Sequence, residues 1–295
     1  IYIYIYKLLA ICGIVLLIIL GTIGIKSVIL RNTSWSLGEE KHILFMGASH
    51  ILNGIDDTVD PEIINLGASS ERYLYTYLKL KYLLPDNPQV DTIVLECAPT
   101  DLWEHADNKY FQDFEAKGHL QYFVPLFGKE EWSVFKKGEN FIFILNYLFN
   151  DFHKNGSSFL KAHGQFEPVY DMQLTKEIVD TLTFNPMPID MAAGNKVNLR
   201  YLKKIIDLCK EYDVKLFFIY MPAVKPELTY NQEEYYKCYN DNFSDIELLD
   251  YSKYNLPLDC YKNAHHLNAK GATIFTKKLT DDLKRTNKWN KNSIQ

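Results

Sequence analysis

The sequence lacks the cysteine and charge patterns that define several protein classes. Of its five cysteines, Cys12 lies in an apolar run, and the other four show no C-x-x-C or Cys/His zinc spacing. We expect these four to be buried thiols, with a single disulfide among them left open. A net charge of -5, with 32 basic and 37 acidic side chains, argues against a nucleic-acid partner. No phosphate-binding glycine loop or metal-ligand cluster occurs, so we expect neither a cofactor nor a metal.

Charge is almost absent from the first thirty residues, which hold only Lys7 and Lys26. The run from Leu8 to Ile25 carries no charge and is long enough to span a bilayer. A signal peptide usually has a shorter apolar core and a small-x-small cleavage site, whereas Lys26-Ser-Val-Ile-Leu-Arg31 follows here. We therefore predict an uncleaved transmembrane anchor over residues 1–30, with a cleaved signal peptide and a buried core helix as alternatives. Positive-inside counting does not fix its orientation.

Short apolar runs alternate with helical stretches from residue 41 onward. This pattern predicts a three-layer α/β/α sandwich with a mostly parallel sheet. In such sheets, ligands bind outside the carboxyl ends of the strands. The expected strands are 42–46, 62–66, 92–95, 214–220 and 246–249, and the expected helices are 71–84, 198–212 and 268–284.

The predicted domain covers residues 41–285, after a linker over 31–40 and before a polar tail over 286–295. Residues 103–196 interrupt the strand and helix pattern and read as an insertion rich in aromatic residues and in Gly and Pro. The apolar stretch 141–152 predicts a helix that packs on the core or touches the bilayer. The aromatic side chains of the insertion are expected in the core, with a sugar-stacking wall as the alternative.

Chemistry is indicated at the ends of predicted strands, where Ser and His residues occur in the connecting loops. Gly47-Ala-Ser49 follows the first strand and predicts a tight turn that exposes the Ser49 hydroxyl. His265 and His266 open the last helix. A nucleophile and its base need to be adjacent in space only, so Ser49 and one of these histidines form a candidate pair.

Three motifs together resemble the SGNH (GDSL-like) hydrolase superfamily: Gly47-Ala-Ser49, Asn65-Leu-Gly67-Ala68 and His266-Leu-Asn-x-x-Gly-Ala. The likeness is closest to the envelope-anchored branch related to alginate O-acetylation proteins and the teichoic-acid D-alanylation protein, and it covers residues 41–100 and 197–283. It implies that Ser49 is the nucleophile and that its N–H and the Gly67 N–H bind the oxyanion. It also implies that His266 is the base, with His265 less favoured.

Two positions depart from the family pattern. The third motif of the family is Gly-x-Asn-Asp, whereas this chain has Ala98-Pro-Thr100-Asp101, which leaves Thr100 as a substitute oxyanion donor. The family has Asp three residues before the catalytic histidine, and here that residue is Asn263. In serine proteases the same change lowers turnover about 10⁴-fold. The chain is therefore expected to be slow, to use another acid such as Asp259, to work as a Ser-His dyad, or to be inactive.

Several other polar residues lie near these motifs. We expect His50 to make a local hydrogen bond rather than to act as a second base. Asp56 and Asp57 are expected to be turn or cap residues rather than metal ligands. Glu96 and Asp101 flank the end of a predicted strand, and the sequence assigns them no role.

The resemblance implies a membrane-anchored serine esterase or O-acyltransferase that forms an acyl-Ser49 intermediate. It also implies acetyl-like esters on envelope polysaccharide or another acylated glycan as substrate, and a membrane-bound O-acyltransferase as partner. The expected location is the cytoplasmic membrane, with one span and an extracytoplasmic domain. The alternatives are a non-catalytic scaffold subunit of a surface-polysaccharide modification or export complex, and an esterase that faces the cytoplasm.

Overall fold

The computed structural model describes residues 2–102, 119, 122–134, 159–160, 164–182, 196–225 and 231–285. The helix predicted over 141–152, much of the 103–196 insertion and the tail over 286–295 lie outside these ranges.

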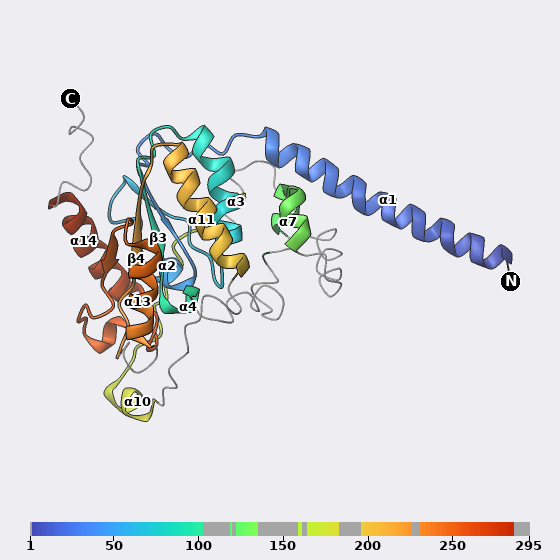
Figure 1. Cartoon of the computed structure of the whole chain (residues 1–295). Helices are drawn as coiled ribbons and strands as arrows, with labels where there is room; N and C mark the ends of the chain where they lie inside the picture. Colours follow the sequence, from blue (N-terminus) through green and yellow to red (C-terminus); the bar gives the residue numbers. More distant parts are fainter. Residues whose placement is uncertain are drawn as a thin grey trace.

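A parallel sheet of five described strands forms the centre of the domain (Figure 1). The strands are adjacent in the order β2-β1-β3-β4-β5, and every pairing is parallel. Their bounds are β1 Ile43–Met46, β2 Ile63–Asn65, β3 Thr92–Glu96, β4 Lys215–Tyr220 and β5 Leu248–Asp250. All five lie where the apolar runs predicted strands, so the predicted parallel α/β class is confirmed.

Helices cover both faces of this sheet, which gives the predicted three layers. Buried side chains of β1 alternate between two apolar clusters: Leu44 and Met46 belong to one, and Ile43 and Phe45 belong to the other. This alternation is what a strand buried on both faces requires. The first cluster includes residues of α3 (Tyr73–Leu83), α11 (Lys196–Glu211) and α13 (Gln232–Phe243), and the second includes residues of α2 (Ser49–Gly54) and α14 (Ala269–Arg285).

Helix α13 was not predicted from the sequence. It is rich in polar residues, and only Tyr235 and Phe243 among its side chains are buried. Asn231 caps its first turn by accepting a hydrogen bond from the Glu234 N–H. The helix is thus held by a capping residue and two buried aromatic side chains, not by a continuous apolar stripe.

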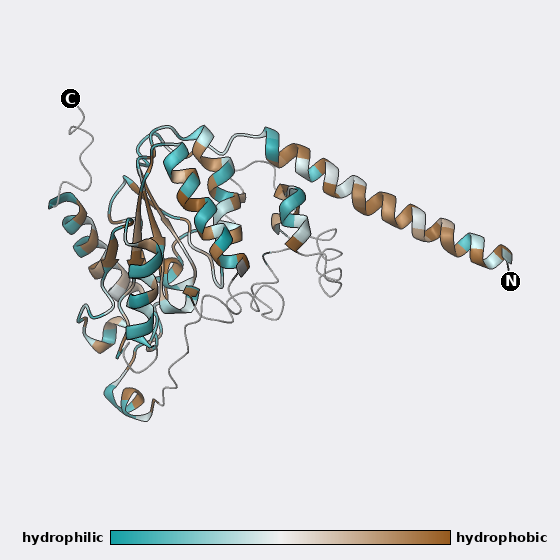
Figure 2. Cartoon of the chain, in the orientation of Figure 1, coloured by the Kyte–Doolittle hydropathy of each residue, from teal (hydrophilic) through white to brown (hydrophobic). Residues whose placement is uncertain are grey.

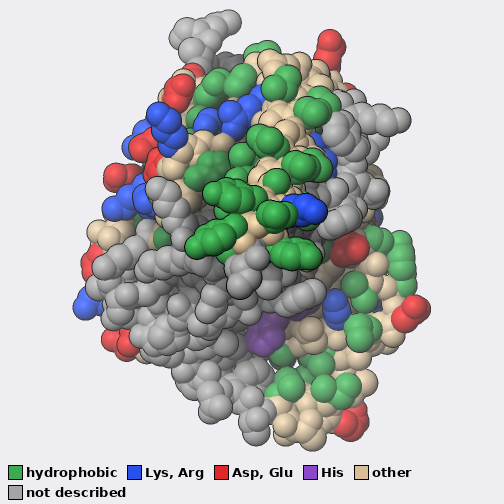
Figure 3. Space-filling view, turned by 90° about the vertical axis from the view of Figure 1, so that its right-hand side faces the viewer, with side chains coloured by type: hydrophobic (Ala, Val, Ile, Leu, Met, Phe, Trp, Pro, Cys, Tyr) green, Lys and Arg blue, Asp and Glu red, His purple; other side chains and the backbone are tan. Residues whose placement is uncertain are grey.

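The first helix, α1 (Tyr2–Asn32), projects away from the domain (Figures 1 and 2). Its 31 residues correspond to about 46 Å, and the helix is long and apolar enough to cross a membrane by length and composition. Only 6% of its most apolar window is buried, so the alternative of a buried core helix is wrong. Figure 3 looks at the molecule from the side to which α1 projects, and hydrophobic side chains gather in the middle of that view, where most of the exposed large hydrophobic residues belong to α1.

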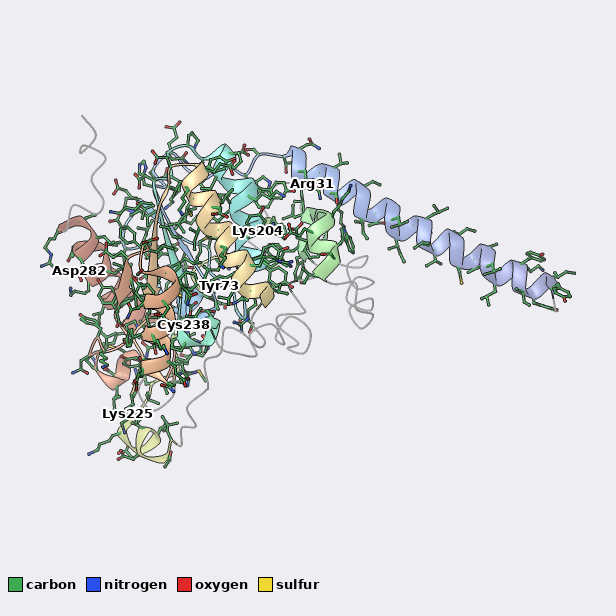
Figure 4. All side chains as sticks on the ribbon, viewed as in Figure 1. Arg31, Tyr73, Lys204, Lys225, Cys238 and Asp282 are labelled. Carbon is green, nitrogen blue, oxygen red and sulfur yellow. The ribbon has the colours of Figure 1, made fainter. Side chains whose placement is uncertain are left out.

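The carboxyl end of α1 is packed on the domain. Ser27 Oγ donates to the Pro125 carbonyl at 2.7 Å, and Arg31 Nη2 donates to the Phe127 carbonyl at 2.6 Å (Figure 4). Both acceptors lie in or next to the short helix η2 (Val124–Leu126). Trp35 is 1% exposed, and its ring lies 5.6 Å from that of Tyr82. The segment predicted as a linker, 31–40, is therefore packed against the domain through the buried side chain of Trp35.

The remaining described elements are short. They are α4 Pro99–Leu102, α7 Lys129–Val134, α10 Lys176–Thr181, η1 Leu84–Asp86 and η5 Leu258–Cys260. Cys97, Cys209 and Cys260 are buried, as expected for small apolar side chains, and Cys238 is half-buried.

Candidate active site

The site lies at the carboxyl ends of β1 and β3, which are neighbours in the sheet. From β1 the chain proceeds to β2 on one side, while β3 pairs with β1 on the other. This is the switch point of the 2-1-3-4-5 strand order, where the loops diverge and leave a crevice for a ligand.

The turn after β1 presents Ser49 at this edge. Gly47 has φ +154, and a Cβ there would lie 2.5 Å from Glu96 Cβ, so only glycine fits. The next residue, Ala48, donates its N–H to Glu96 Oε2 at 2.7 Å. Ser49 then begins α2. The close approach of the turn to β3 fixes the position of the serine hydroxyl.

His266 reaches Ser49 from the loop before α14, although 217 residues separate them. Ser49 Oγ lies 2.7 Å from His266 Nε2. The loop is closed by a bridge between Tyr261 and Leu267 and by the Lys262 N–H, which donates to the His266 carbonyl at 2.9 Å. The structure thus brings together the hydroxyl and the imidazole that the sequence motifs paired.

Asn263 holds the other side of the imidazole. Its Oδ1 accepts the backbone N–H groups of His265 at 2.9 Å and His266 at 3.0 Å, and it lies 3.0 Å from His266 Nδ1. Two backbone donors require an acceptor, so the amide oxygen and not the amide nitrogen faces the ring. The proton of the neutral imidazole is then on Nδ1, and Nε2 has the lone pair that a base needs toward Ser49.

The environment of His266 favours the neutral imidazole. Burial lowers the pKa of His266 to about 3, and the side chains of His50, Lys262 and His265, in their cationic forms, act in the same direction. Asp259, the alternative acid of the sequence analysis, instead forms an exposed ion pair with Lys270 at 2.5 Å. His266 therefore has a neutral amide, and not a carboxylate, on Nδ1.

His50 and Glu96 form a second pair beside the first. The His50 ring lies against that of His266, with the ring centroids 4.7 Å apart and the planes at 35°. His50 Nδ1 contacts Glu96 Oε1, and Glu96 is 2% exposed. His50 thus makes a hydrogen bond, but to a partner 46 residues away and not to a local one. That partner, Glu96, which the sequence left unassigned, lies at the centre of the site.

A further buried carboxyl group lies close to Glu96. Asp101 Oδ2 accepts the Ala98 N–H at 2.9 Å, and its Oδ1 lies 3.5 Å from Arg72 Nη1. Burial, followed by the negative charge of Glu96, raises the pKa of Asp101 to about 7, while Arg72 opposes this. Four titratable groups, Arg72, Asp101, Glu96 and His50, therefore form one electrostatically linked layer at the ends of the strands beside Ser49 and His266.

The second motif is packed against α2. A Cβ at Gly67 would lie 2.8 Å from the Leu52 backbone nitrogen, so glycine is required for this approach. The Gly67 N–H donates to Asn65 Oδ1 at 2.9 Å, and Asn65 Nδ2 donates to the Ile51 and Ile55 carbonyls at 2.8 and 2.7 Å. Gly67 thus lies beside the helix that begins with Ser49, with its N–H paired to Asn65 in this structure.

A buried ion pair supports the loop that carries Gly67. Lys79 and Glu71 are both fully buried and in contact, and Lys79 Nζ also donates to the Leu66 carbonyl at 2.8 Å. Thr100, the third expected oxyanion donor, is half-exposed in the short helix α4. Within the described part of the chain, no hydrogen bond joins Thr100 to Ser49 or His266.

Ser49 and His266 open into a cleft of about 710 Å³. One wall is the segment 167–172, held through its backbone: the Glu167 N–H donates to the Leu52 carbonyl at 3.0 Å, and Asn53 Nδ2 donates to the Glu167 carbonyl at 2.9 Å. Tyr170 is 73% exposed on this wall. The lining residues are Ser49, Leu52, Asn53, Ser69, Ser70, Glu167, Pro168, Val169, Tyr170, Asp171, Met172, Lys262 and His266.

Sequence reasoning missed this wall and Asn53. Asn53 lies four residues after Ser49 on α2, a spacing that places two side chains on one face of a helix, so the signal was present. Asp56 makes the turn contact expected of it, since its Oδ1 accepts the Thr58 N–H, whereas Asp57 Oδ2 accepts the N–H of Asn65 at the end of β2. Across residues 2–285, as far as they are described, no group of three or more His, Cys, Asp or Glu side chains is arranged to hold a metal ion.

A protein-family model without a descriptive name matches residues 190–287, which is less than half of the chain. No curated protein matches the sequence. Solved structures that match include a candidate acylhydrolase from Bacteroides fragilis, at 10% identity over 83% of this chain and 88% of that one, with a TM-score of 0.38. A GDSL-like lipase from Bacteroides thetaiotaomicron matches at 10% identity over 86% and 92%, with a TM-score of 0.38.

A candidate platelet activating factor from Streptococcus pneumoniae matches at 14% identity over 94% of this chain and 99% of that one, with a TM-score of 0.42. Two of the three names belong to the hydrolase class that the sequence motifs resemble. At these identities and TM-scores the likenesses carry no argument about activity, which has to come from the geometry of the site.

Proposed function

We propose that this protein is a serine-dependent ester hydrolase or O-acyltransferase of SGNH type, with Ser49 as nucleophile and His266 as base. One observation carries the proposal: Ser49 Oγ lies 2.7 Å from His266 Nε2, while Asn263 Oδ1 fixes the imidazole tautomer that leaves Nε2 free to accept a proton. A nucleophile, a base and an orienting group in this order are the constellation of acyl transfer.

The reaction begins when His266 Nε2 takes the Ser49 hydroxyl proton as Oγ attacks the carbonyl carbon of an ester. The tetrahedral intermediate collapses when the leaving alcohol takes the proton back from Nε2, and the acyl group stays on Ser49. Water or a sugar hydroxyl then attacks the acyl-enzyme, gives its proton to His266, and releases Ser49 when that proton returns to Oγ.

The oxyanion is proposed to rest on the backbone N–H groups of Ser49 and Gly67, with Thr100 as a further donor. Gly67 donates to Asn65 Oδ1 in this structure, so its use requires that this hydrogen bond be shared or released. The approach of Gly67 to the Leu52 backbone supports the role, since it brings the loop against the helix that carries the nucleophile.

The proposed substrate is an acetyl-like ester on envelope polysaccharide or another acylated glycan. The cleft supports this, because its backbone-anchored wall presents the exposed ring of Tyr170 beside polar side chains such as Asn53 and Asp171. An exposed aromatic face and several hydrogen-bonding groups suit a sugar ring. Hydrolysis and transfer share every step up to the acyl-enzyme and differ in whether the cleft admits water.

The proposed location is the cytoplasmic membrane, with α1 as one span and the catalytic domain outside the cytoplasm. The fixed junction at Arg31 and Trp35 supports an anchor that holds the domain close to the bilayer. A membrane-bound O-acyltransferase is the proposed partner and donor of acyl groups. Protease treatment of intact cells tests the orientation, because digestion of the domain without lysis requires an extracytoplasmic face.

The activity is tested by labelling the full-length protein in detergent micelles with a fluorophosphonate probe. We expect the parent to be labelled, and Ser49→Ala and His266→Ala to abolish labelling. Ser133→Ala, on the surface helix α7, is the matched control and should label like the parent. Absence of labelling in a parent that melts cooperatively would refute the proposal.

A non-catalytic scaffold subunit of a surface-polysaccharide complex is the second candidate. Asn263 favours it, since the residue offers His266 no charge and the pKa of His266 is lowered to about 3. Under this function the unlabelled parent would still bind a glycan in its cleft, and Ser49→Ala would bind it equally well.

A further inference from the structure

The charged form of His266 is costly in this site, yet the proposed reaction has to form it. When Nε2 takes the Ser49 proton, the ring becomes an imidazolium. Asn263 accepts a hydrogen bond from this ring but does not neutralise its charge. Burial and the Lys262 cation add to that cost, and His50 and His265 add to it when they are protonated. Serine hydrolases normally meet this need with a carboxylate on Nδ1. A site without one needs negative charge from another direction.

Glu96 is the carboxylate that lies in that direction. It is the last residue of β3 and is 2% exposed. One of its oxygens accepts the Ala48 N–H at 2.7 Å, and the other contacts His50 Nδ1. The His50 ring in turn lies on the His266 ring, with centroids 4.7 Å apart. A buried carboxylate, a bridging imidazole and the base therefore follow one another in a continuous row.

We propose that Glu96, through the His50 ring that it holds against His266, supplies the negative charge that Asn263 does not supply. Glu96 and His50 are then positioning residues for the base. When His50 is neutral and donates its Nδ1 proton to the carboxylate, the pair carries one negative charge beside the imidazolium. This inference rests on the proposed function, since it needs His266 to act as the base of Ser49.

The charge of the pair depends on the groups packed around it. Asp101, which is paired with Arg72, lies within electrostatic range of Glu96, and His265 and Lys262 lie on the loop of His266. With Asp101 ionised and His50 neutral, the layer of Arg72, Asp101, Glu96 and His50 carries a net negative charge, and uptake of one proton cancels it.

A pH dependence follows from this proton. The pKa of Asp101 is raised to about 7 by burial and by Glu96, so the layer becomes negative as the pH rises through that value. The acylation rate should therefore rise with pH near 7. His266 does not produce that rise, because its lowered pKa keeps it neutral throughout this range.

Four full-length proteins in detergent micelles test the proposal: the parent, Glu96→Gln, Asn263→Asp and the double variant. The measurement is the rate constant for fluorophosphonate labelling of Ser49. We expect Glu96→Gln to lower it about 30-fold, the effect of a unit charge roughly 8 Å away at an effective dielectric constant near 20. Asn263→Asp should restore the rate in the Glu96→Gln background and change the parent rate less than about 3-fold.

This rescue separates an electrostatic role from a structural one. Asn263→Asp places its charge at Nδ1 of the His266 ring, in the loop before α14, so it does not repair a turn after β1 that lost its Ala48 bond. The rise in rate near pH 7 should also disappear in Glu96→Gln. Asp56→Asn removes a buried carboxylate away from His266 and is the matched control, expected to keep the parent rate.

Equal rates for Glu96→Gln and the parent would overturn the proposal. So would an equal gain from Asn263→Asp in both backgrounds. If melting curves show that Glu96→Gln does not fold, His50→Gln takes its place, since it breaks the row but leaves the Glu96 bond to Ala48 intact. A parent that is never labelled refutes the proposed function itself, which keeps the two failures distinguishable.

Discussion

Replacement of Asn263 by alanine tests how the base is held. The Asn263 oxygen accepts three N–H groups, from the backbones of His265 and His266 and from the His266 ring. Alanine leaves two half-buried backbone donors without this acceptor, at about 1 kcal/mol each, or about 2 kcal/mol of stability in total. For a chain of this size that loss lowers the melting temperature by roughly 4–8 °C.

The kinetic effect of the same change should be larger than its effect on stability. Without Asn263 Oδ1, the His266 ring is free to rotate and to place its proton on Nε2, the tautomer that does not accept from Ser49. We expect the fluorophosphonate labelling rate to fall about 100-fold, within the range that a positioned general base contributes.

Labelling kinetics and tryptophan-fluorescence melting of the full-length protein in micelles measure both quantities. Asn242→Ala is the matched control, because Asn242 is an exposed residue of α13 whose amide donates to the Cys238 carbonyl. If Asn263→Ala labels within about 3-fold of the parent, the imidazole is not oriented by this residue, and the argument from its tautomer is wrong.

Three further predictions concern stability. The pKa of His266 is lower in the folded protein than its ordinary value of 6.5, so the stability that the neutral imidazole contributes is lost as the pH falls from about 6.5 toward 3. Between pH 7 and pH 4.5, the melting temperature of the parent should therefore drop more than that of His266→Gln. Trp35→Ala should cost about 3–5 kcal/mol in denaturant unfolding, whereas Trp35→Phe keeps much of the packing; equal midpoints for the two would contradict the packed junction. Lys79→Met leaves Glu71 buried without its cation and should cost about 3–5 kcal/mol, and the double change with Glu71→Leu should recover most of it; a double variant as unstable as Lys79→Met would show that the pair is not what limits stability.

Much of the fold follows from local sequence patterns. The strand β1 is an apolar run that stops before Gly47, and β3 is an apolar run that ends at Glu96; their burial on both faces is what such runs predict. Helix α14 was predicted from its apolar spacing within one residue at each end. Helix α13 was missed because a polar sequence with two buried aromatic residues has too weak an apolar period.

The sequence predicted the pairing of Ser49 with a histidine but not the residues that surround this pair. The motifs brought out Ser49 and His266, but no sequence pattern relates His50 to Glu96. Their contact depends on the β1–β3 pairing, in which Met46 lies opposite Leu95, so that the turn after β1 meets the end of β3. Strand order depends on the whole chain, and for that reason the contacts of Glu96 and Asp101 could not be predicted from the local sequence.

Asn263 illustrates how charge alone misleads a comparison of residue types. In a serine protease, the Asp-to-Asn change is harmful because the amide favours the wrong imidazole tautomer. Here the backbone N–H groups of residues 265 and 266 both donate to Asn263 Oδ1. These local hydrogen bonds keep the amide nitrogen of Asn263 away from the ring. The orienting half of the Asp role is therefore retained by geometry, and only its charge is missing. Because orientation and charge are separated in this way, Asn263→Asp and Glu96→Gln, measured together, decide whether Glu96 supplies the missing charge.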